Sequence, residues 1–114
     1  MSSESLQRPI WWQPWVGNHP MGRYQEHYRR ADRNDLLWDL AGGTEIRADL
    51  AALMMGRIIP TTEDFYILNR ERRGLFVLSL DVRQPGFSSI MTTYIRLAQE
   101  SVEFALKEWP TDQA

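Results

Sequence analysis

The sequence contains no cysteine, and this absence excludes disulfide bonds and thiolate metal ligands. It is also compatible with a reducing compartment. No apolar run approaches the roughly 18 residues that a membrane helix requires, and Met1 to Glu4 are followed by neither the basic nor the hydrophobic region of a secretion signal. We therefore expect a cytoplasmic protein that does not contact a membrane.

Net charge is also small, because 13 basic and 15 acidic residues leave a formal charge of −2 at pH 7. This balance gives no global attraction to nucleic acid or to an acidic membrane, so any such binding requires a local patch. All but one of the basic residues are Arg. Arg suits the recognition of carboxylates and phosphates, but its scatter along the chain favours genomic codon bias as the explanation.

Established catalytic motifs are missing as well. Ser88 and Ser89 follow a predicted strand, but the residues around them lack the glycine pattern of a nucleophile elbow. Asp81, Glu63 and Asp64 could form an acidic cluster, yet no characteristic spacing accompanies them, and no glycine-rich phosphate loop is present. An enzyme therefore remains an alternative for which no catalytic residue can be named.

The two histidines, His19 and His27, invite a metal hypothesis because Glu26 lies between them. Their spacing matches no established ligand pattern, and the sequence suggests no third ligand. We predict neither a metal nor another cofactor.

A length of 114 residues and a hydrophobic fraction of 43% are those of one globular domain. We place this domain at residues 9–110, between a flexible N-terminus at residues 1–8 and a flexible C-terminus at residues 111–114.

Two apolar runs, at residues 65–68 and 75–82, are separated by a charged segment that ends in Gly74. This pattern predicts an antiparallel β-hairpin, to which residues 57–60 could add a third strand. A four-residue loop pairs Asn69 with Gly74 and puts on the core side of the hairpin Phe65, Ile67, Phe76, Leu78, Leu80 and Val82. The opposite side then carries Tyr66, Leu68, Leu75, Val77, Ser79 and Asp81.

That opposite side is apolar near the loop and has no obvious cover in the sequence. A two-fold dimer would cover it, because such an interface is self-complementary. We therefore predict a homodimer whose interface contains Tyr66, Leu68, Leu75 and Val77.

From Ile90 onward the apolar residues recur at steps of three and four. The spacing predicts one long C-terminal helix, capped by Ser88 or Ser89 and ended by Pro110, with a stripe of Met91, Tyr94, Ala98, Val102, Ala105 and Trp109. Because an isolated hairpin is marginal in water, this helix should pack across the core side of the hairpin.

Three short helices are predicted ahead of the hairpin. The first lies around residues 23–30, the second runs from an Asn34 cap to Gly42, and the third runs from a Thr44 cap to Gly56. The second helix contains Leu36, Leu37, Trp38 and Leu40. The buried stripe of the third contains Ile46, Leu50, Leu53 and Met54. The predicted fold class is therefore α+β: short N-terminal helices, a hairpin or small three-stranded sheet, and a long C-terminal helix.

Residues 9–16 form an extended arm that is rich in Trp and Pro. Its prolines forbid a helix, and its three indoles belong to Trp11, Trp12 and Trp15. Such an arm could dock on a partner, where Trp is the residue most enriched among hot spots, or add to the edge of a sheet. Alternatively it wraps its own domain, and the indoles complete the core.

Two segments suggest nucleic-acid binding. The helix at residues 45–55 could act as the second helix of a helix-turn-helix, but Glu45 and Asp49 cancel the charge of Arg47. The hairpin loop at residues 70–73 is the better candidate for an anion, and its basic residues are Arg70, Arg72 and Arg73.

By elimination, the sequence favours a small soluble intracellular protein-binding module: an adaptor, inhibitor, accessory subunit or chaperone. The positive indication is a surplus of Trp for so short a core, at positions Trp11, Trp12, Trp15, Trp38 and Trp109. Nucleic-acid binding and a small enzyme are the alternatives.

Overall fold

The computed structural model describes residues 14–56, 65–80, 86–87 and 89–108. In chain order, the elements of this part are β1 (Pro14–Val16), α1 (Asn18–Gln25), α2 (Arg33–Ala41), β2 (Thr44–Ile46), α3 (Ala48–Met54), β3 (Phe65–Asn69), β4 (Gly74–Ser79), β5 (Ser89–Arg96) and α4 (Gln99–Glu108). The α+β class is confirmed. None of the described helices has the length and apolar character needed to cross a membrane.

The sheet has five strands in the order β1-β5-β4-β3-β2, and this corrects the expected hairpin or three-stranded sheet. Strand β1 runs parallel to β5, whereas the other neighbours are antiparallel. Both edge strands have only three residues, which is too short for an alternating apolar pattern to stand out in a sequence. The segment at residues 57–60, predicted as a possible third strand, lies outside the described residues.

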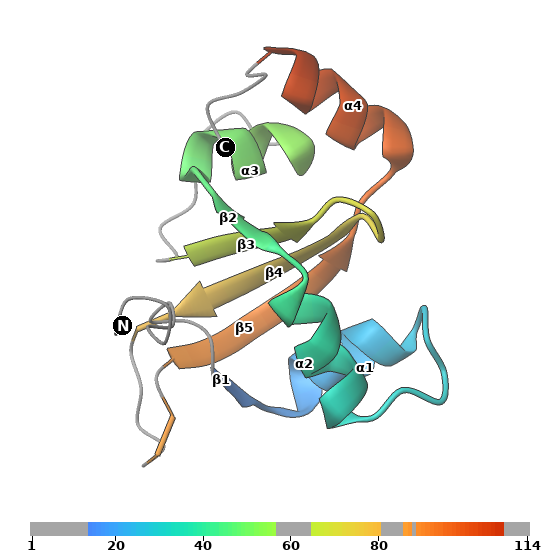
Figure 1. Cartoon of the computed structure of the whole chain (residues 1–114), viewed down its shortest axis with the longest axis vertical. Helices are drawn as coiled ribbons and strands as arrows, with labels where there is room; N and C mark the ends of the chain where they lie inside the picture. Colours follow the sequence, from blue (N-terminus) through green and yellow to red (C-terminus); the bar gives the residue numbers. More distant parts are fainter. Residues whose placement is uncertain (1–13, 57–64, 81–85, 88, 109–114) are drawn as a thin grey trace, which may run out of the picture.

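Helices cover both faces of the sheet, as Figure 1 shows, with α3 and α4 on one side and α1 and α2 on the other. Each face has its own hydrophobic core. The core beneath α3 and α4 contains Ile46, Leu50, Ala51, Met54, Tyr66, Leu68, Leu75, Val77, Leu97, Val102 and Ala105. The core beneath α1 and α2 contains Val16, Tyr24, Leu36, Leu40, Ile67, Phe76, Leu78, Met91 and Tyr94.

The hairpin of β3 and β4 has the predicted register. Asn69 pairs with Gly74, Ile67 with Phe76, and Phe65 with Leu78. A loop of fixed length sets which residues face each other, so the alternation of the paired side chains followed from the sequence alone. Leu80, expected on the core side, lies beyond the end of β4 and is 47% exposed.

The second face of this hairpin is covered within the chain, contrary to expectation. Tyr66, Leu68, Leu75 and Val77 are all buried, because α3 and α4 pack on them. The prediction treated this face as lacking intrachain cover, and that reason for a dimer interface is therefore gone. Self-association itself stays a prediction.

The prediction of one long helix from Ile90 to Trp109 was wrong. Residues Ser89–Arg96 form β5, and α4 has only ten residues, Gln99–Glu108. The expected caps fail with it, since Ser89 lies within the strand, while Ser88 and Pro110 lie outside the described residues.

A β-bulge explains the misleading spacing in β5. Leu78 pairs with Met91 and Val77 with Thr93, so Thr92 is an extra residue in the ladder. Met91 and Tyr94 are three positions apart, yet both reach the core beneath α1 and α2. A regular strand would send them to opposite faces, and a spacing of three in one core is what a helix shows. The Thr92 hydroxyl donates to the Val77 carbonyl at 2.9 Å and satisfies the backbone at the bulge.

Helix α4 packs on the face opposite to the expected one. Its Val102 and Ala105 join the core that also contains Leu75 and Val77, rather than the core of Phe76. The shortening of the helix accounts for this, because Leu97, directly after β5, already belongs to this core and the chain therefore enters α4 on that side of the sheet.

The N-terminal helices were predicted with shifted boundaries. Asp32 caps α2, rather than Asn34. Thr44 begins strand β2 instead of capping a helix, and α3 starts at Ala48. The buried residues of the third predicted helix are nevertheless core residues, apart from the partly buried Leu53.

The described end of the Trp-rich arm belongs to this sheet. Residues Pro14–Val16 form β1 and pair with Ser89, Ile90 and Met91 of β5. Of the possibilities left open by the sequence, the last three residues of the arm therefore add to the sheet edge of their own domain.

Candidate protein-binding surface

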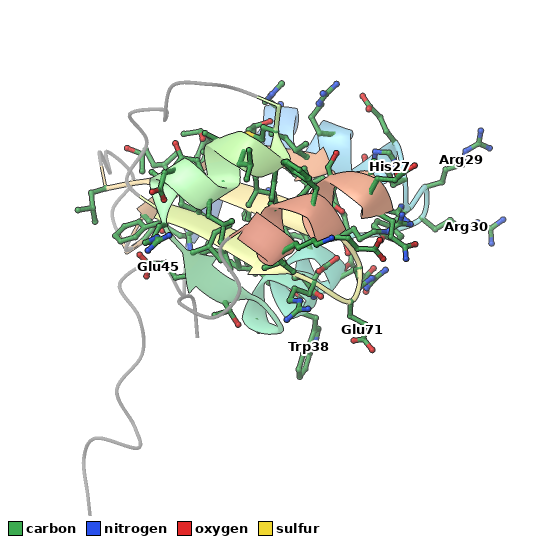
Figure 2. All side chains as sticks on the ribbon, turned by 90° about the horizontal axis from the view of Figure 1, so that it is seen from above. His27, Arg29, Arg30, Trp38, Glu45 and Glu71 are labelled. Carbon is green, nitrogen blue, oxygen red and sulfur yellow. The ribbon has the colours of Figure 1, made fainter. Side chains whose placement is uncertain are left out.

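Trp38 is the most exposed large apolar side chain among the described residues, at 78% of its full accessibility. It lies on α2, whose buried residues are Leu36, Asp39 and Leu40. Figure 2 shows its side chain projecting away from the ribbon. The large apolar surface of an indole is usually buried when a protein folds, but that of Trp38 is exposed to solvent.

The sequence placed Trp38 on this helix and counted it among the surplus Trp residues, but did not name it as a binding residue. Leu36, Leu37, Trp38 and Leu40 form an almost continuous apolar run, which does not specify the inward side. The actual inward positions, 36, 39 and 40, have helical spacing, but the polar Asp39 conceals it. The polar residue at one inward position therefore concealed from the sequence which side of α2 is exposed.

Helix α2 is fixed firmly at its N-terminus. Asp32 and Asp35 form a capping box, in which each side chain accepts a backbone N–H bond from the other residue at 2.9 Å. Arg33 Nη2 also donates to the Val16 carbonyl at 3.1 Å and ties the helix to β1. Trp38 therefore projects from a rigid support.

The C-terminal half of α2 is held by the buried carboxylate of Asp39. Asn69 Nδ2 donates to Asp39 Oδ1 at 2.8 Å, and the Tyr24 hydroxyl lies 3.1 Å from Asp39 Oδ2. Arg72 Nε lies 3.7 Å from the same Oδ2. These partners come from β3, α1 and the hairpin loop, so one carboxylate joins α2 to three other parts of the chain.

Burial raises the pKa of the Asp39 carboxyl above its ordinary value, while the charge of Arg72 and the hydrogen bonds from Tyr24 and Asn69 act in the opposite direction. Burial also raises the pKa of the Tyr24 hydroxyl, and the neighbouring charge of Asp39 adds to this effect. Tyr24 therefore remains a hydrogen-bond donor at neutral pH.

The Asp39 carboxyl is placed to hold the fold together and is out of reach of a substrate. The Asp39 side chain has no exposed surface, and both of its oxygens already have protein partners. A general acid or base must come within hydrogen-bonding distance of a substrate, which this carboxyl cannot do in the described arrangement.

A cleft of about 450 Å³ opens on one side of Trp38. Its lining combines aromatic and charged side chains: Tyr24, Tyr28, Arg29, Arg30, Ala31, Asp35, Trp38 and Arg72. The Arg72 guanidinium stacks over the Tyr28 ring at 4.3 Å from its centroid. Arg29 and Arg30 point away from the body of the protein in Figure 2.

A second hollow, of about 250 Å³, lies on the other side of Trp38. Asn34, Leu37 and Ala41 line it together with Trp38. All four residues belong to α2, and none of them is charged. The indole therefore separates a basic cleft from an uncharged hollow.

The three arginines predicted as an anion site line two different hollows. Arg72 lies in the cleft beside Trp38, whereas Arg70 and Arg73 line a different hollow against α4. In that hollow Glu71 and Glu103 balance the two positive charges.

The other nucleic-acid candidate, at residues 45–55, has little free charge. Arg47 Nε lies 3.3 Å from Asp49 Oδ1 at the start of α3. The face of α3 that carries Leu50, Ala51 and Met54 is buried in the core.

Of the indoles predicted to bind a partner, Trp11 and Trp12 lie outside the described residues. Trp15 lies on β1 and is partly buried. Its six-membered ring covers Gly17, where a Cβ atom would lie 2.8 Å from Trp15 Cη2. This ring therefore packs against its own chain.

No group of three or more residues that could hold a metal ion occurs in the described part of the chain. The His19 ring contacts the Thr93 hydroxyl at 3.2 Å, and the His27 ring lies 6.4 Å from that of Tyr94. Ser89 is completely buried, whereas Asp81, Glu63 and Asp64 lie outside the described residues.

Fold and surface together describe a small α+β domain that presents one exposed indole between two hollows. No protein-family model, no curated protein and no solved structure matches this chain.

Proposed function

We propose that this protein works by binding another protein, and that the surface around Trp38 makes the contact. It would act in the cytoplasm as an adaptor, inhibitor, accessory subunit or chaperone. The single observation that carries the proposal is the 78% exposure of an indole on a helix held at both ends.

The energetics of an exposed Trp support a binding role. An aromatic side chain covers about 200 Å² and apolar burial contributes about 25 cal/mol per Å², so a partner that covers the indole could gain on the order of 4 kcal/mol. Trp residues of this kind are prominent among interface hot spots. A rigid support increases the gain, because little conformational freedom is lost on binding.

Phe104 provides a matched control for the test. It is also an exposed aromatic residue, at 55%, but it lies on α4, in the layer on the other side of the sheet. Replacing either residue by Ala removes an aromatic ring without opening a cavity in the core.

The experiment compares affinity capture from a native cell extract by the wild type, Trp38→Ala and Phe104→Ala. We expect Trp38→Ala to lose its captured protein by about tenfold or more, and Phe104→Ala to retain it. Thermal melting of the purified variants should show that both remain folded. Equal capture by the wild type and Trp38→Ala would reject this surface, and recovery of salt-sensitive nucleic acid instead of protein would favour the nucleic-acid alternative.

A further inference from the structure

We infer that the Trp38 surface recognises an acidic segment of the partner protein. This inference rests on the proposed function and specifies its ligand. Carboxylates of the segment would meet Arg29, Arg30 and Arg72 in the basic cleft, and a neighbouring apolar side chain would enter the hollow beside Leu37 and Ala41.

The charges of the cleft are the first argument. Its lining contains three Arg and one Asp, so it stays locally positive in a chain whose formal charge is −2, even though the buried Asp39 lies 3.7 Å from Arg72. Asp35 is already engaged in the capping box of α2. Arg29 and Arg30 are exposed and form no ion pair with any other described residue, and they are therefore available to a carboxylate.

The position of Arg72 is the second argument. Its guanidinium is stacked on Tyr28 and held near Asp39, yet its side chain remains 43% exposed. A planar guanidinium that is fixed before binding recognises a carboxylate with little loss of conformational freedom. The buried network thus orients one of the three cations.

The uncharged hollow distinguishes a peptide from a nucleic acid. Leu37 and Ala41 lie one turn apart on α2 with no cation in the lining, which suits a single apolar side chain. A phosphate backbone that passed Trp38 would leave the arginines and enter this hollow without any positive partner. A peptide can alternate charged and apolar residues along its length, so it fits both sides of the indole.

Selection from a displayed library of random dodecapeptides tests the inference without knowledge of the natural partner. The wild type and Trp38→Ala are screened in parallel, and peptides that require Trp38 are synthesised with a fluorescent label. We expect these peptides to be enriched in Asp and Glu around an apolar or aromatic residue. Fluorescence anisotropy then measures their affinities for the variants.

Charge reversal provides the decisive comparison. Arg29→Glu/Arg30→Glu should weaken binding by about tenfold or more, whereas Arg70→Glu/Arg73→Glu, an equal change in charge at the other hollow, should alter it by less than about threefold. Added salt should weaken wild-type binding as well.

The outcomes separate the inference from the proposed function. Selected peptides without acidic enrichment, or equal binding by Arg29→Glu/Arg30→Glu, would overturn the acidic segment and leave Trp38-dependent protein binding intact. A selection that yields no Trp38-dependent peptide would contradict the inference directly. Trp38-dependent binding of a short oligo-dT strand in the same assay would overturn the inference and identify single-stranded nucleic acid as the ligand of this surface.

Discussion

Asn69 and Asp39 join the hairpin to helix α2 through two hydrogen bonds from one amide. Asn69 Nδ2 donates to Asp39 Oδ1 at 2.8 Å and to the Asp39 carbonyl at 2.9 Å. The same side chain accepts the Arg72 backbone N–H at 3.3 Å through its Oδ1 atom. The end of β3, the hairpin loop and the last turn of α2 therefore share one buried polar contact.

Asn69→Ala should lower the free energy of unfolding by about 2 to 3 kcal/mol, because it leaves the buried Oδ1 atom of Asp39 without its amide donor and removes one of the two donors to the Asp39 carbonyl. Urea denaturation of the purified variant measures the change. Asn34→Ala, on the exposed face of the same helix, should change it by no more than about 0.5 kcal/mol. Similar effects at the two positions would show that the Asn69 contact contributes nothing specific.

Removal of the hydroxyl group should lower stability at Tyr24 but should not lower it at Tyr94. Their rings meet edge to face at 5.0 Å, and both are buried. Tyr24→Phe removes a donor to Asp39 and should destabilise by about 1 to 2 kcal/mol. The Tyr94 hydroxyl is buried without a hydrogen-bond partner among the described residues, so Tyr94→Phe should be neutral or stabilising by up to about 1 kcal/mol. Melting temperatures decide this directly, and a lower value for Tyr94→Phe would mean that its hydroxyl does have a partner.

Stability should depend on pH through Asp39. Burial raises the pKa of the Asp39 carboxyl in the folded protein. Its contribution to the free energy of unfolding is therefore fully present below the ordinary pKa of Asp, and it is lost as the pH rises through the pKa of the folded state. Arg72 opposes this shift. Arg72→Ala should therefore destabilise by about 1 kcal/mol more at neutral pH than below about pH 3, where Asp39 is protonated in both states.

Denaturation midpoints over this pH range measure the difference, with Arg70→Ala as the matched control in the same loop. An effect of Arg72→Ala that is the same at both ends of the range would mean that its role is packing on Tyr28 alone. Arg70→Ala should show no such trend, because Arg70 lies in the other hollow.

Val77→Glu distinguishes a core residue from a dimer interface. Val77 is 5% exposed beneath α3 and α4, so an ionised side chain there should unfold the chain. Circular dichroism and light scattering on the same sample give the answer. A folded variant of half the wild-type mass would instead restore the dimer interface expected from the sequence.

The features that local sequence rules control were predicted correctly, whereas the features that depend on residues distant in the sequence were not. The hairpin register followed from a loop of fixed length, and every predicted pair is present. Strand β5 was read as a helix, because the bulge at Thr92 places Met91 and Tyr94 on one face. A bulge is defined by the neighbouring strand, so spacing within one segment could not reveal it.

The candidate site was missed for a comparable reason. Exposure of Trp38 depends on which side of α2 faces the sheet. This side carries Leu36 and Leu40 in the core and the buried Asp39, whose partners lie on α1, β3 and the hairpin loop. Those partners are distant in the sequence. Likewise, Arg72 was grouped with Arg70 because they are neighbours in the chain, although the loop directs them to different hollows.

The parallel pairing of β1 with β5 imposes an order on folding during synthesis. Pro14 leaves the ribosome well before its partner Ser89, because most of the sheet lies between them in the chain. At about 5 to 20 residues per second, β1 waits roughly 4 to 15 s before its partner strand exists. The β3–β4 hairpin needs only adjacent residues and can form first. We therefore expect the N-terminal strand to close the sheet last, and its Trp-bearing segment to be exposed to chaperones throughout that interval.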